Sequence, residues 1–352
     1  MKKPRRSDDP EAAGAARLNQ RKADHLEACL DDGVDLGQDS FALWKLRYHA
    51  LPEIALEAVS TRTTFAGRPI SAPLIISCMT GGAGEPFRTI NRNLALGAEA
   101  LGIPMGLGSM KVMLSHEDAT ASYLVRELAP SVPIIANLGL VSFNYGLTYA
   151  DIERITGAVR PDAFGLHLNA LQEVVQEGGD TDFSGLLDKL GEIARRCELP
   201  IYIKECGGGI APELVQSLAE AGAAYVDISG SDGTSWAAVE ARLSTDPTFG
   251  ELFRDFGLPT AWILERLTPA QRGGAKIVAS GGIRNGIQAA KALALGADYV
   301  AVARPFLLAA AQSAEAVAAV GGRLIRELRA AMFLVGAATL ESLDRSVLID
   351  TR

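Results

Sequence analysis

Residues 276–284 read KIVASGGIR, and residues 299–305 read YVAVARP. Each stretch opens with a short apolar run rich in Val, Ile or Ala and closes with small or basic residues. Short apolar runs bounded by turn residues are typical of parallel strands that are buried on both faces. The two stretches therefore predict buried strands over residues 276–280 and 299–303.

The same pattern occurs six more times upstream, and a helical pattern follows each apolar run. The six further strands are expected over residues 74–79, 105–108, 133–138, 163–168, 200–204 and 225–229. Helices are expected between the strands, for example over residues 86–100 and 211–221, which carry Pro near their first turns. Eight strands that alternate with helices predict a (β/α)8 TIM barrel, and an open doubly wound sheet is the alternative.

The chain has 352 residues, of which 48% are hydrophobic and 22% are charged. This composition suits one large domain with a sizeable core. Residues 1–16 mix charges with Pro, Gly and Ala without periodicity, so we expect a disordered lead there. Residues 17–352 are expected to form a single barrel domain with an N-terminal helical extension. Residues 236–272 exceed a simple crossover, and we interpret them as extra structure that is part of a lid.

Charge and cysteine usage exclude several classes of protein. The formal net charge of -8 argues against a surface that binds nucleic acid. The four cysteines form no CxxC pair and show no metal-ligand spacing with the four histidines, so we expect reduced thiols. No apolar region follows the basic residues at the N-terminus, and no apolar run is long enough to span a membrane. We therefore expect a soluble, cytoplasmic protein.

The carboxyl ends of the expected strands carry a dense rim of polar and small residues, which is where an α/β barrel places its functional groups. Gly281 and Gly282 follow the seventh strand, and Arg304 follows the eighth. Such glycines allow backbone N–H groups to approach a phosphate, and a helix N-terminus adds a favourable dipole. The rim predicts a phosphate site, although glycines that only form tight turns are the alternative.

Lys204 ends the fifth expected strand, and a buried lysine needs an anionic partner. A flavin N1/O2 edge or an anionic substrate group would provide one; a salt bridge to Glu205 or Asp227 is the alternative. Thr80, Ser109 and Asn137 end other strands and could hydrogen-bond the edge of an isoalloxazine ring.

These residues fall into motifs that occur in a fixed order along the chain. The motifs are Arg21-Lys22 with His25, MTGG at 79–82, MGLGS at 105–109, Asn137, HLNALQE at 167–173, KE at 204–205, SGSDGT at 229–234 and SGGIR at 280–284. In these motifs the chain resembles the type 2, flavin-dependent isopentenyl diphosphate isomerases. The HLNALQE motif is the most specific, because related flavin barrels do not share it.

The resemblance implies an isomerase that interconverts isopentenyl diphosphate and dimethylallyl diphosphate with reduced FMN and Mg²⁺, and with NADPH as reductant. The implied FMN residues are Met79, Thr80, Gly81, Ser109, Asn137, Lys204, Ser229, Thr234, Gly282, Arg284, Ala303 and Arg304. The implied substrate residues are Arg21, Lys22, His167, Asn169 and Gln172. Glu173 would bind the magnesium ion, and Lys204, Gln172 and His167 are the implied catalytic residues. A homotetramer or homo-octamer is also implied.

Plainer roles remain open for several of these residues. Arg21 and Lys22 could form a solvated helix face, Glu173 could be a favourable acid in a first helical turn, and His167 could be a satisfied strand-end histidine.

Three competing functions are weighed against the isomerase. An FMN-dependent oxidoreductase of the hydroxy-acid oxidase type is the first, but it needs a base histidine near the sixth or seventh strand and none follows His167. A non-flavin barrel that binds a sugar phosphate is the second, and a flavin-binding regulatory protein is the third. Neither would require the HLNALQE motif.

The chain departs from the family pattern at three places. Met110-Lys111 replace a usual Gln-Arg pair, which keeps a cation but loses a fork of donors. Cys206 stands where a bulkier residue is commoner, and Phe256 stands where a Trp is expected.

Overall fold

In the computed structural model of this chain, the described residues are 10–352. Eight parallel strands close into a barrel in the order β10-β11-β4-β5-β6-β7-β8-β9. The barrel strands are β4 (Leu74–Ile76), β5 (Met105–Gly106), β6 (Ile134–Gly139), β7 (Ala163–His167), β8 (Ile201–Lys204), β9 (Ala223–Asp227), β10 (Lys276–Ala279) and β11 (Tyr299–Val302). All eight overlap the ranges that the sequence predicts, although β9 begins and ends two residues before its predicted range. The closed order confirms the TIM barrel and excludes the open sheet.

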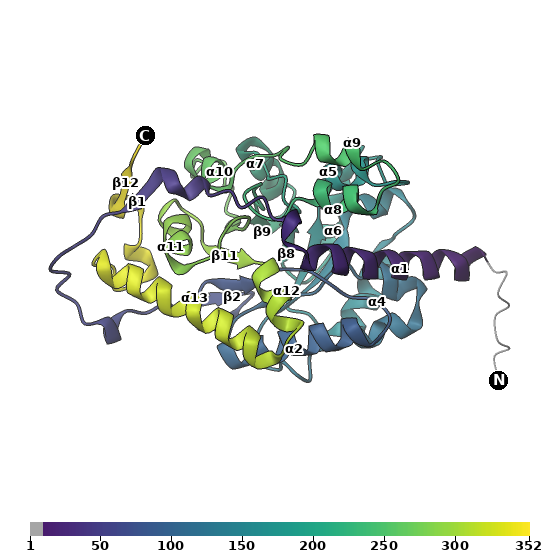
Figure 1. The fold of residues 1–352 in the computed structure, drawn as a ribbon. Helices are drawn as coiled ribbons and strands as arrows, with labels where there is room; N and C mark the ends of the chain where they lie inside the picture. The colour runs from purple at the N-terminus through teal and green to yellow at the C-terminus, as the bar shows by residue number, and fades with distance from the viewer. Residues whose placement is uncertain (1–9) are drawn as a thin grey trace.

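Helices surround the barrel, and α13 packs along α2 and α12 on one side of it (Figure 1). Both expected helices are present, as α2 and α7. The helices are α1 (Pro10–Leu30), α2 (Glu85–Leu101), α3 (Lys111–Ser115), α4 (Tyr149–Val159), α5 (Ala170–Val175), α6 (Leu186–Arg196), α7 (Pro212–Glu220), α8 (Trp236–Leu243), α9 (Pro247–Leu252), α10 (Thr260–Arg266), α11 (Gly286–Ala294), α12 (Arg304–Ala310) and α13 (Ala314–Leu334).

A β-hairpin closes the amino-terminal end of the barrel. Strands β2 (Thr63–Phe65) and β3 (Arg68–Ile70) pair around Ala66-Gly67, which both have positive φ, as a tight hairpin turn requires. Phe65 packs on tyrosines near the starts of three barrel strands, Tyr202, Tyr225 and Tyr299. This end of the barrel is thus filled with aromatic rings, which leaves the carboxyl end to form a site.

The N-terminal helix α1 begins earlier than the sequence predicts. It starts at Pro10, inside the expected disordered lead, and residues 1–9 of that lead lie outside the described residues. Four alanines between residues 12 and 16 explain the longer helix, because alanine is the strongest helix former. Helix α1 contacts α3, α8 and α12 and so lies beside the carboxyl end of the barrel (Figure 1).

Two short strands outside the barrel join regions near the two ends of the chain. Strand β1 (Trp44–Leu46) pairs antiparallel with β12 (Leu348–Asp350), a pairing that the apolar runs do not reveal. Among the described residues, no helix combines the length and apolarity that crossing a membrane requires.

The long segment after β9 forms α8, α9 and α10, which confirms the extra structure expected over residues 236–272. Helix α8 packs against α1 and α5, and α9 packs against α8. The extra helices therefore contribute a wall to the mouth of the barrel; their opening and closing as a lid stays a prediction.

Candidate active site

Two adjoining cavities lie at the carboxyl end of the barrel and share one floor. The first cavity is lined by residues that follow β4, β9, β10 and β11. The second cavity is lined by residues that follow β5, β6, β7 and β8. Lys22, Met79, Lys204, Cys206 and Trp236 line both, so a ligand in one cavity can contact a ligand in the other.

The predicted site residues divide between these cavities. Those in the first cavity are Met79, Thr80, Lys204, Ser229, Thr234, Gly282, Arg284, Ala303 and Arg304, together with Lys22. Those in the second are Arg21, Lys22, Met79, Ser109, Asn137, His167, Asn169, Gln172, Glu173 and Lys204. Gly81 lines neither cavity; a Cβ at this position would collide with the ring of Tyr123, so its described role is packing.

Glycines after β10 shape one end of the first cavity. Gly281 and Gly282 have φ values of 92° and 77°, a left-handed backbone that favours glycine. A Cβ on Gly281 would also collide with the carbonyl oxygen of Gly230. Within residues 10–352, the backbone N–H groups of Gly281, Gly282 and Ala303 have no hydrogen-bond acceptor. Such unpaired donors beside the start of α12 suit a phosphate group.

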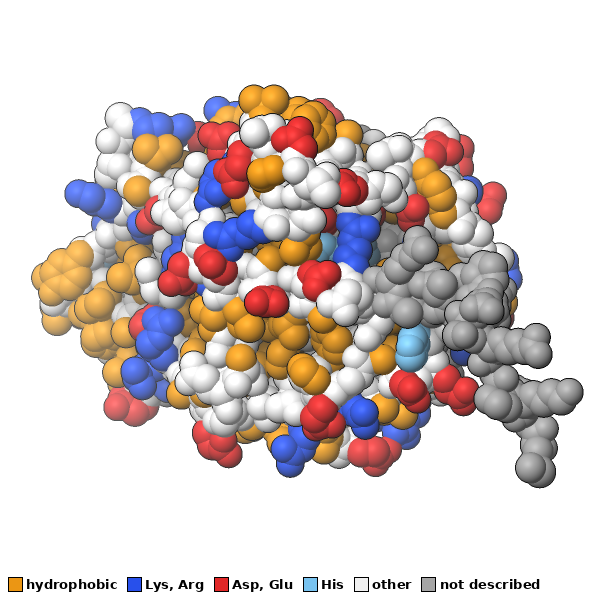
Figure 2. Space-filling model, turned by 45° about the vertical axis from the view of Figure 1, so that its right-hand side comes forward, with side chains coloured by type: hydrophobic (Ala, Val, Ile, Leu, Met, Phe, Trp, Pro, Cys, Tyr) orange, Lys and Arg blue, Asp and Glu red, His pale blue; other side chains and the backbone are white. Residues whose placement is uncertain are grey.

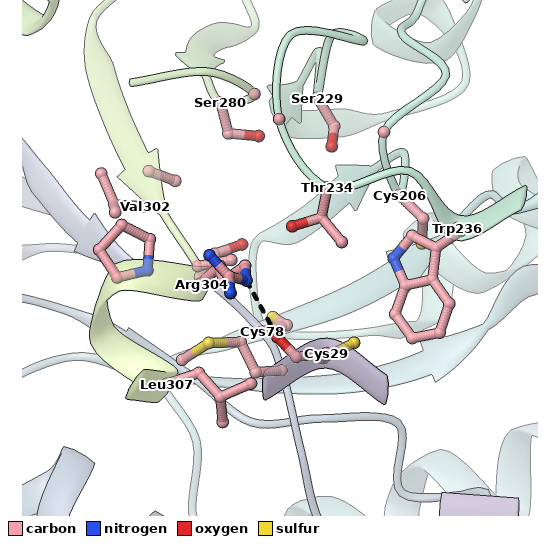
Figure 3. A pocket seen from close by; sticks show the side chains of 18 of the residues that line it. Cys29, Cys78, Cys206, Ser229, Thr234, Trp236, Ser280, Val302, Arg304 and Leu307 are labelled. Carbon is pink, nitrogen blue, oxygen red and sulfur yellow. Dashed lines mark hydrogen bonds between the residues drawn. The ribbon is translucent and has the colours of Figure 1, made fainter. Parts of the chain in front are cut away.

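The two arginines at this end are held by the N-terminal segment. Arg284 bonds the Asp35 carboxylate at 2.6 Å and the Asp232 carbonyl oxygen at 2.9 Å. Arg304 donates to the carbonyl oxygen of Cys29 at 3.0 Å and to the Asp32 carboxylate at 2.7 Å, as Figure 3 shows for Cys29. Arg304 therefore joins the end of α1 to the barrel, and Arg284 joins the segment that follows α1; the sequence did not indicate either role.

Lys204 lies buried on the shared floor. Its Nζ donates to the carbonyl oxygen of Glu205 at 2.7 Å and lies 3.6 Å from the sulfur of Cys206. Burial by itself would lower the pKa of Lys204, but Cys206, Asp227, Cys78 and Glu205 together raise it above its usual value. Lys204 is therefore an ammonium ion at neutral pH, able to stabilise an anionic ligand.

His167 and Asn137 form one wall of the second cavity. The Nδ1 atom of His167 lies 3.1 Å from Oδ1 of Asn137, an acceptor, which assigns the ring proton to Nδ1. Burial, aided by Lys204, Lys22 and Lys111, holds the pKa of His167 well below its usual value. The neutral ring therefore keeps Nε2 as a hydrogen-bond acceptor.

Helix α5 carries the polar residues of the HLNALQE motif into the second cavity. Asn169 Nδ2 donates to Glu173 Oε1 at 2.7 Å, and the backbone N–H of Asp180 donates to Glu173 Oε2 at 2.7 Å. Asn169 Oδ1 is buried and has no hydrogen-bond partner. An unpaired buried oxygen beside a carboxylate is the kind of group that a ligand would satisfy.

Glu240 on α8 is a central residue of the site that sequence reasoning missed. Its side chain is buried and accepts hydrogen bonds from Gln172 at 2.8 Å, His25 at 2.9 Å and Arg21 at 3.2 Å. Glu240 therefore connects α1 to α5. The sequence signal was available, since an acid lies among the small apolar residues of WAAVEARL, but an acid on a helix rarely signals a site.

Lys22 lies next to Arg21 on α1 and lines both cavities. Burial lowers the pKa of Lys22 to about 8, with further lowering by Arg21 and Lys111 against an opposing effect of Cys206. A solvated helix face does not describe Lys22, because its half-buried side chain lines both cavities.

Lys111 also lies in the second cavity, where its Nζ bonds Asp180 at 2.8 Å. The preceding Met110 is fully buried in the core. Of the two substituted positions, only Lys111 can therefore contact a ligand.

The site fits both groups that the resemblance implies. The unpaired backbone donors after β10 and β11 suit the phosphate of FMN, and Lys204 suits an electron-rich flavin edge. Glu173 and the unpaired Asn169 Oδ1 are oxygen ligands of the kind that Mg²⁺ prefers. Among the described residues, no three His, Cys, Asp or Glu side chains form a metal site. A magnesium ion would therefore depend on substrate oxygens.

Comparison with known proteins agrees with this site. The model of the FMN-dependent dehydrogenase family matches residues 156–350. An isopentenyl-diphosphate delta-isomerase of Synechococcus sp. is 42% identical over 338 residues, which cover 95% of this chain and 97% of the relative. An isopentenyl-diphosphate delta-isomerase of Paracoccus zeaxanthinifaciens is 44% identical over 336 residues, covering 94% of this chain and 96% of the relative.

Solved structures with the same fold share little sequence with this chain. A mutant flavocytochrome b2 with pyruvate bound has a TM-score of 0.68 at 19% identity, covering 96% of this chain and 85% of that one. A mandelate oxidase variant has a TM-score of 0.63 at 20% identity, covering 92% and 96%. These structures support the barrel, whereas the sequence relatives define the family. The chain belongs to the family of FMN-dependent isopentenyl-diphosphate delta-isomerases.

Proposed function

We propose that the protein interconverts isopentenyl diphosphate and dimethylallyl diphosphate, with FMN in the first cavity and the diphosphate substrate in the second. The single observation that carries this proposal is the shared floor of the two cavities, where Lys204 faces both. The floor would place a flavin ring and an alkene in contact. The reaction moves one double bond, so the terminal alkene carbon gains a proton, the carbon on the other side of the branched carbon loses one, and no net oxidation occurs.

The substrate would bind through its charge. Arg21 and Lys22 supply cations, and Lys111 supplies a third at the far side of the second cavity. A bound diphosphate would raise the pKa of His167 and turn Nε2 into a hydrogen-bond donor. The side chain of Gln172, held by Glu240, would then lie near the allyl portion of the substrate.

FMN and Mg²⁺ would supply chemistry that the side chains cannot. Reduced FMN would deliver a proton to the alkene and stabilise the positive charge that develops. Leu18, Met79 and Trp236 add apolar surface beside it, which keeps water away from that charge. Mg²⁺ on Glu173 would neutralise the diphosphate, and NADPH is the proposed source of the electrons that keep the flavin reduced.

The test is an anaerobic assay of both diphosphates with FMN and Mg²⁺, with and without NADPH. Conversion in both directions that requires FMN and a reductant supports the proposal. A yellow protein that converts neither diphosphate would overturn it. Two further experiments distinguish the role of the metal from that of the flavin: leaving out Mg²⁺ and replacing Glu173 by Gln. In both, substrate affinity and rate should fall while FMN binding persists.

An FMN-dependent hydroxy-acid oxidase remains the second candidate, because the barrel and its family model are shared with such enzymes. No histidine follows His167, so none of the residues after β9 and β10 that line the first cavity can act as a base histidine. The isomerase is therefore favoured. Reduction of the bound flavin by lactate or mandelate would reverse this preference.

We also propose that the protein is a homotetramer or homo-octamer. Large apolar side chains are exposed near the β1–β12 pair, among them Tyr48, Leu51 and Ile349. On the face that Figure 2 shows, basic and acidic side chains are interspersed around apolar areas. Sedimentation of the flavin-loaded protein should give a multiple of the chain mass of 37.1 kDa.

A further inference from the structure

Asp227 at the end of β9 is a fully buried carboxylate that lines neither cavity. It accepts hydrogen bonds from the hydroxyl of Ser280 at 2.6 Å, the hydroxyl of Tyr202 at 2.8 Å and the backbone N–H of Ser229 at 3.2 Å. Burial raises the pKa of Asp227, whereas the ammonium of Lys204 and these three donors favour the ionised carboxylate. Burying such a charge costs free energy of folding, so a carboxylate retained beneath the site indicates a functional role.

Asp227 and Lys204 lie on neighbouring strands of the barrel, without an ion pair between them among the described residues. The two residues are register partners on the neighbouring parallel strands β8 and β9. Residues at matching positions of adjacent strands point to the same face of a sheet, which here is the barrel interior. The two direct contacts of Lys204 Nζ, the Glu205 carbonyl oxygen and the Cys206 thiol, carry no charge at neutral pH, because burial raises the pKa of Cys206 to about 11.

Asp227 also fixes two residues of the first cavity. Ser229 has a φ of 37°, a left-handed conformation that is strained for a residue other than glycine. The bond from its N–H to the Asp227 carboxylate, two residues earlier, is the kind of local contact that stabilises such a turn. Ser229 and Ser280 both line the first cavity, and Figure 3 shows their hydroxyls at its upper side.

We propose that Asp227 is a positioning residue of the flavin site: its buried carboxylate keeps Lys204 in its charged form and holds Ser229 and Ser280 at the cavity wall. The inference rests on the proposed flavin site but not on the isomerase reaction. A flavin titration of the unaltered protein reports on the site alone, so failure of the site and failure of the Asp227 role are distinguishable.

Other charged or titratable groups also face Lys204 and must be taken into account. Those nearest are Cys78 after β4, His167 on β7, Glu205 and Cys206 after β8, and Asp227 on β9. Lys22 lines the same shared floor, and Arg21, Lys111, Glu173 and Asp180 line the second cavity. Glu205 is already engaged by the backbone N–H groups of Gly207 and Gly209, at 2.5 and 3.2 Å. Removing the Asp227 carboxylate should therefore lower the pKa of Lys204, because the penalty for burying the ammonium is then less well offset.

The test compares Asp227→Asn with Asp227→Ala in FMN titrations from pH 6 to 9.5. Asn keeps the shape and an acceptor for Ser229 but removes the charge, so burial should lower the pKa of Lys204. FMN affinity of the Asn variant should then fall about tenfold as pH rises through that lowered value, because a charge-assisted contact is lost. The unaltered protein should stay flat over this range. The reduction potential of the bound flavin should fall in parallel.

Two further variants separate charge from structure. Ser280→Ala removes a hydrogen bond but no charge, so it should weaken FMN binding without a new pH dependence. In a Lys204→Met background, Asp227→Asn should add little, since the charge it supports is gone. A pH-independent FMN affinity in Asp227→Asn would overturn the charge role. If Asp227→Asn does not fold, the Lys204→Met/Asp227→Asn pair decides: recovery of folding supports the proposal, and continued unfolding contradicts it.

Discussion

At the scale of single residues, Lys22 is a side chain whose protonation state changes at mildly alkaline pH. It is charged below a pKa of about 8 and neutral above it, so its attraction for a diphosphate is present at neutral pH and is lost as pH rises. We expect kcat/KM for isopentenyl diphosphate to fall about tenfold as pH increases past this value, the loss of one charge-assisted contact.

The matched control is Lys22→Arg, because a guanidinium stays charged throughout this range. In this variant kcat/KM should no longer decline at alkaline pH, while any decline at acid pH that other groups cause should remain. Steady-state rates of the reduced, magnesium-loaded enzyme between pH 6 and 9.5 provide the measurement. A decline that is identical in both proteins would assign the titration to another group.

At the scale of elements, the structure depends on how α1 is held against the barrel. Glu240 on α8 binds Arg21 and His25 of α1 and also Gln172 of α5, and all four line or adjoin the second cavity. Replacing Glu240 by Gln keeps the size but leaves three donors poorly matched, among them the half-buried cation of Arg21, a cost of about 1–3 kcal/mol. We expect KM for the substrate to rise roughly 5- to 150-fold, the range to which such a free energy corresponds.

Limited proteolysis distinguishes a loosened helix from a lost contact with substrate. In Glu240→Gln, cleavage within residues 18–40 should quicken, while the barrel strands stay protected. The control is Glu251→Gln on α9, whose exposed carboxylate bonds only Arg254 among the described residues. An intact α1 with unchanged KM in Glu240→Gln would show that the α1–α8 contact is dispensable.

The elements also show what the sequence could predict. Strands buried on both faces need continuous apolar runs, so all eight barrel strands were found, and the polar rim at their carboxyl ends followed from topology. Contacts between distant segments leave no such local pattern. Arg304 and Arg284 bind the segment around Asp32 and Asp35, some 250 residues earlier in the chain, and Glu240 binds α1. The β1–β12 pair is equally non-local, and only the folded chain reveals it.

At the scale of the whole molecule, a ligand that binds only the folded chain must stabilise it. FMN at about 100 times its dissociation constant adds about 2.7 kcal/mol to the free energy of unfolding, whichever residues hold it. Riboflavin has the same ring without the phosphate, so the unpaired N–H groups of Gly281, Gly282 and Ala303 cannot be satisfied by it. We therefore expect FMN to raise Tm by a few degrees and riboflavin, at equal concentration, to raise it clearly less. Thermal scans of flavin-free protein with each compound, and with inorganic phosphate as the control, measure the difference. Equal shifts from FMN and riboflavin would place the phosphate outside the glycine turn, whereas no shift from either would remove the flavin from the first cavity.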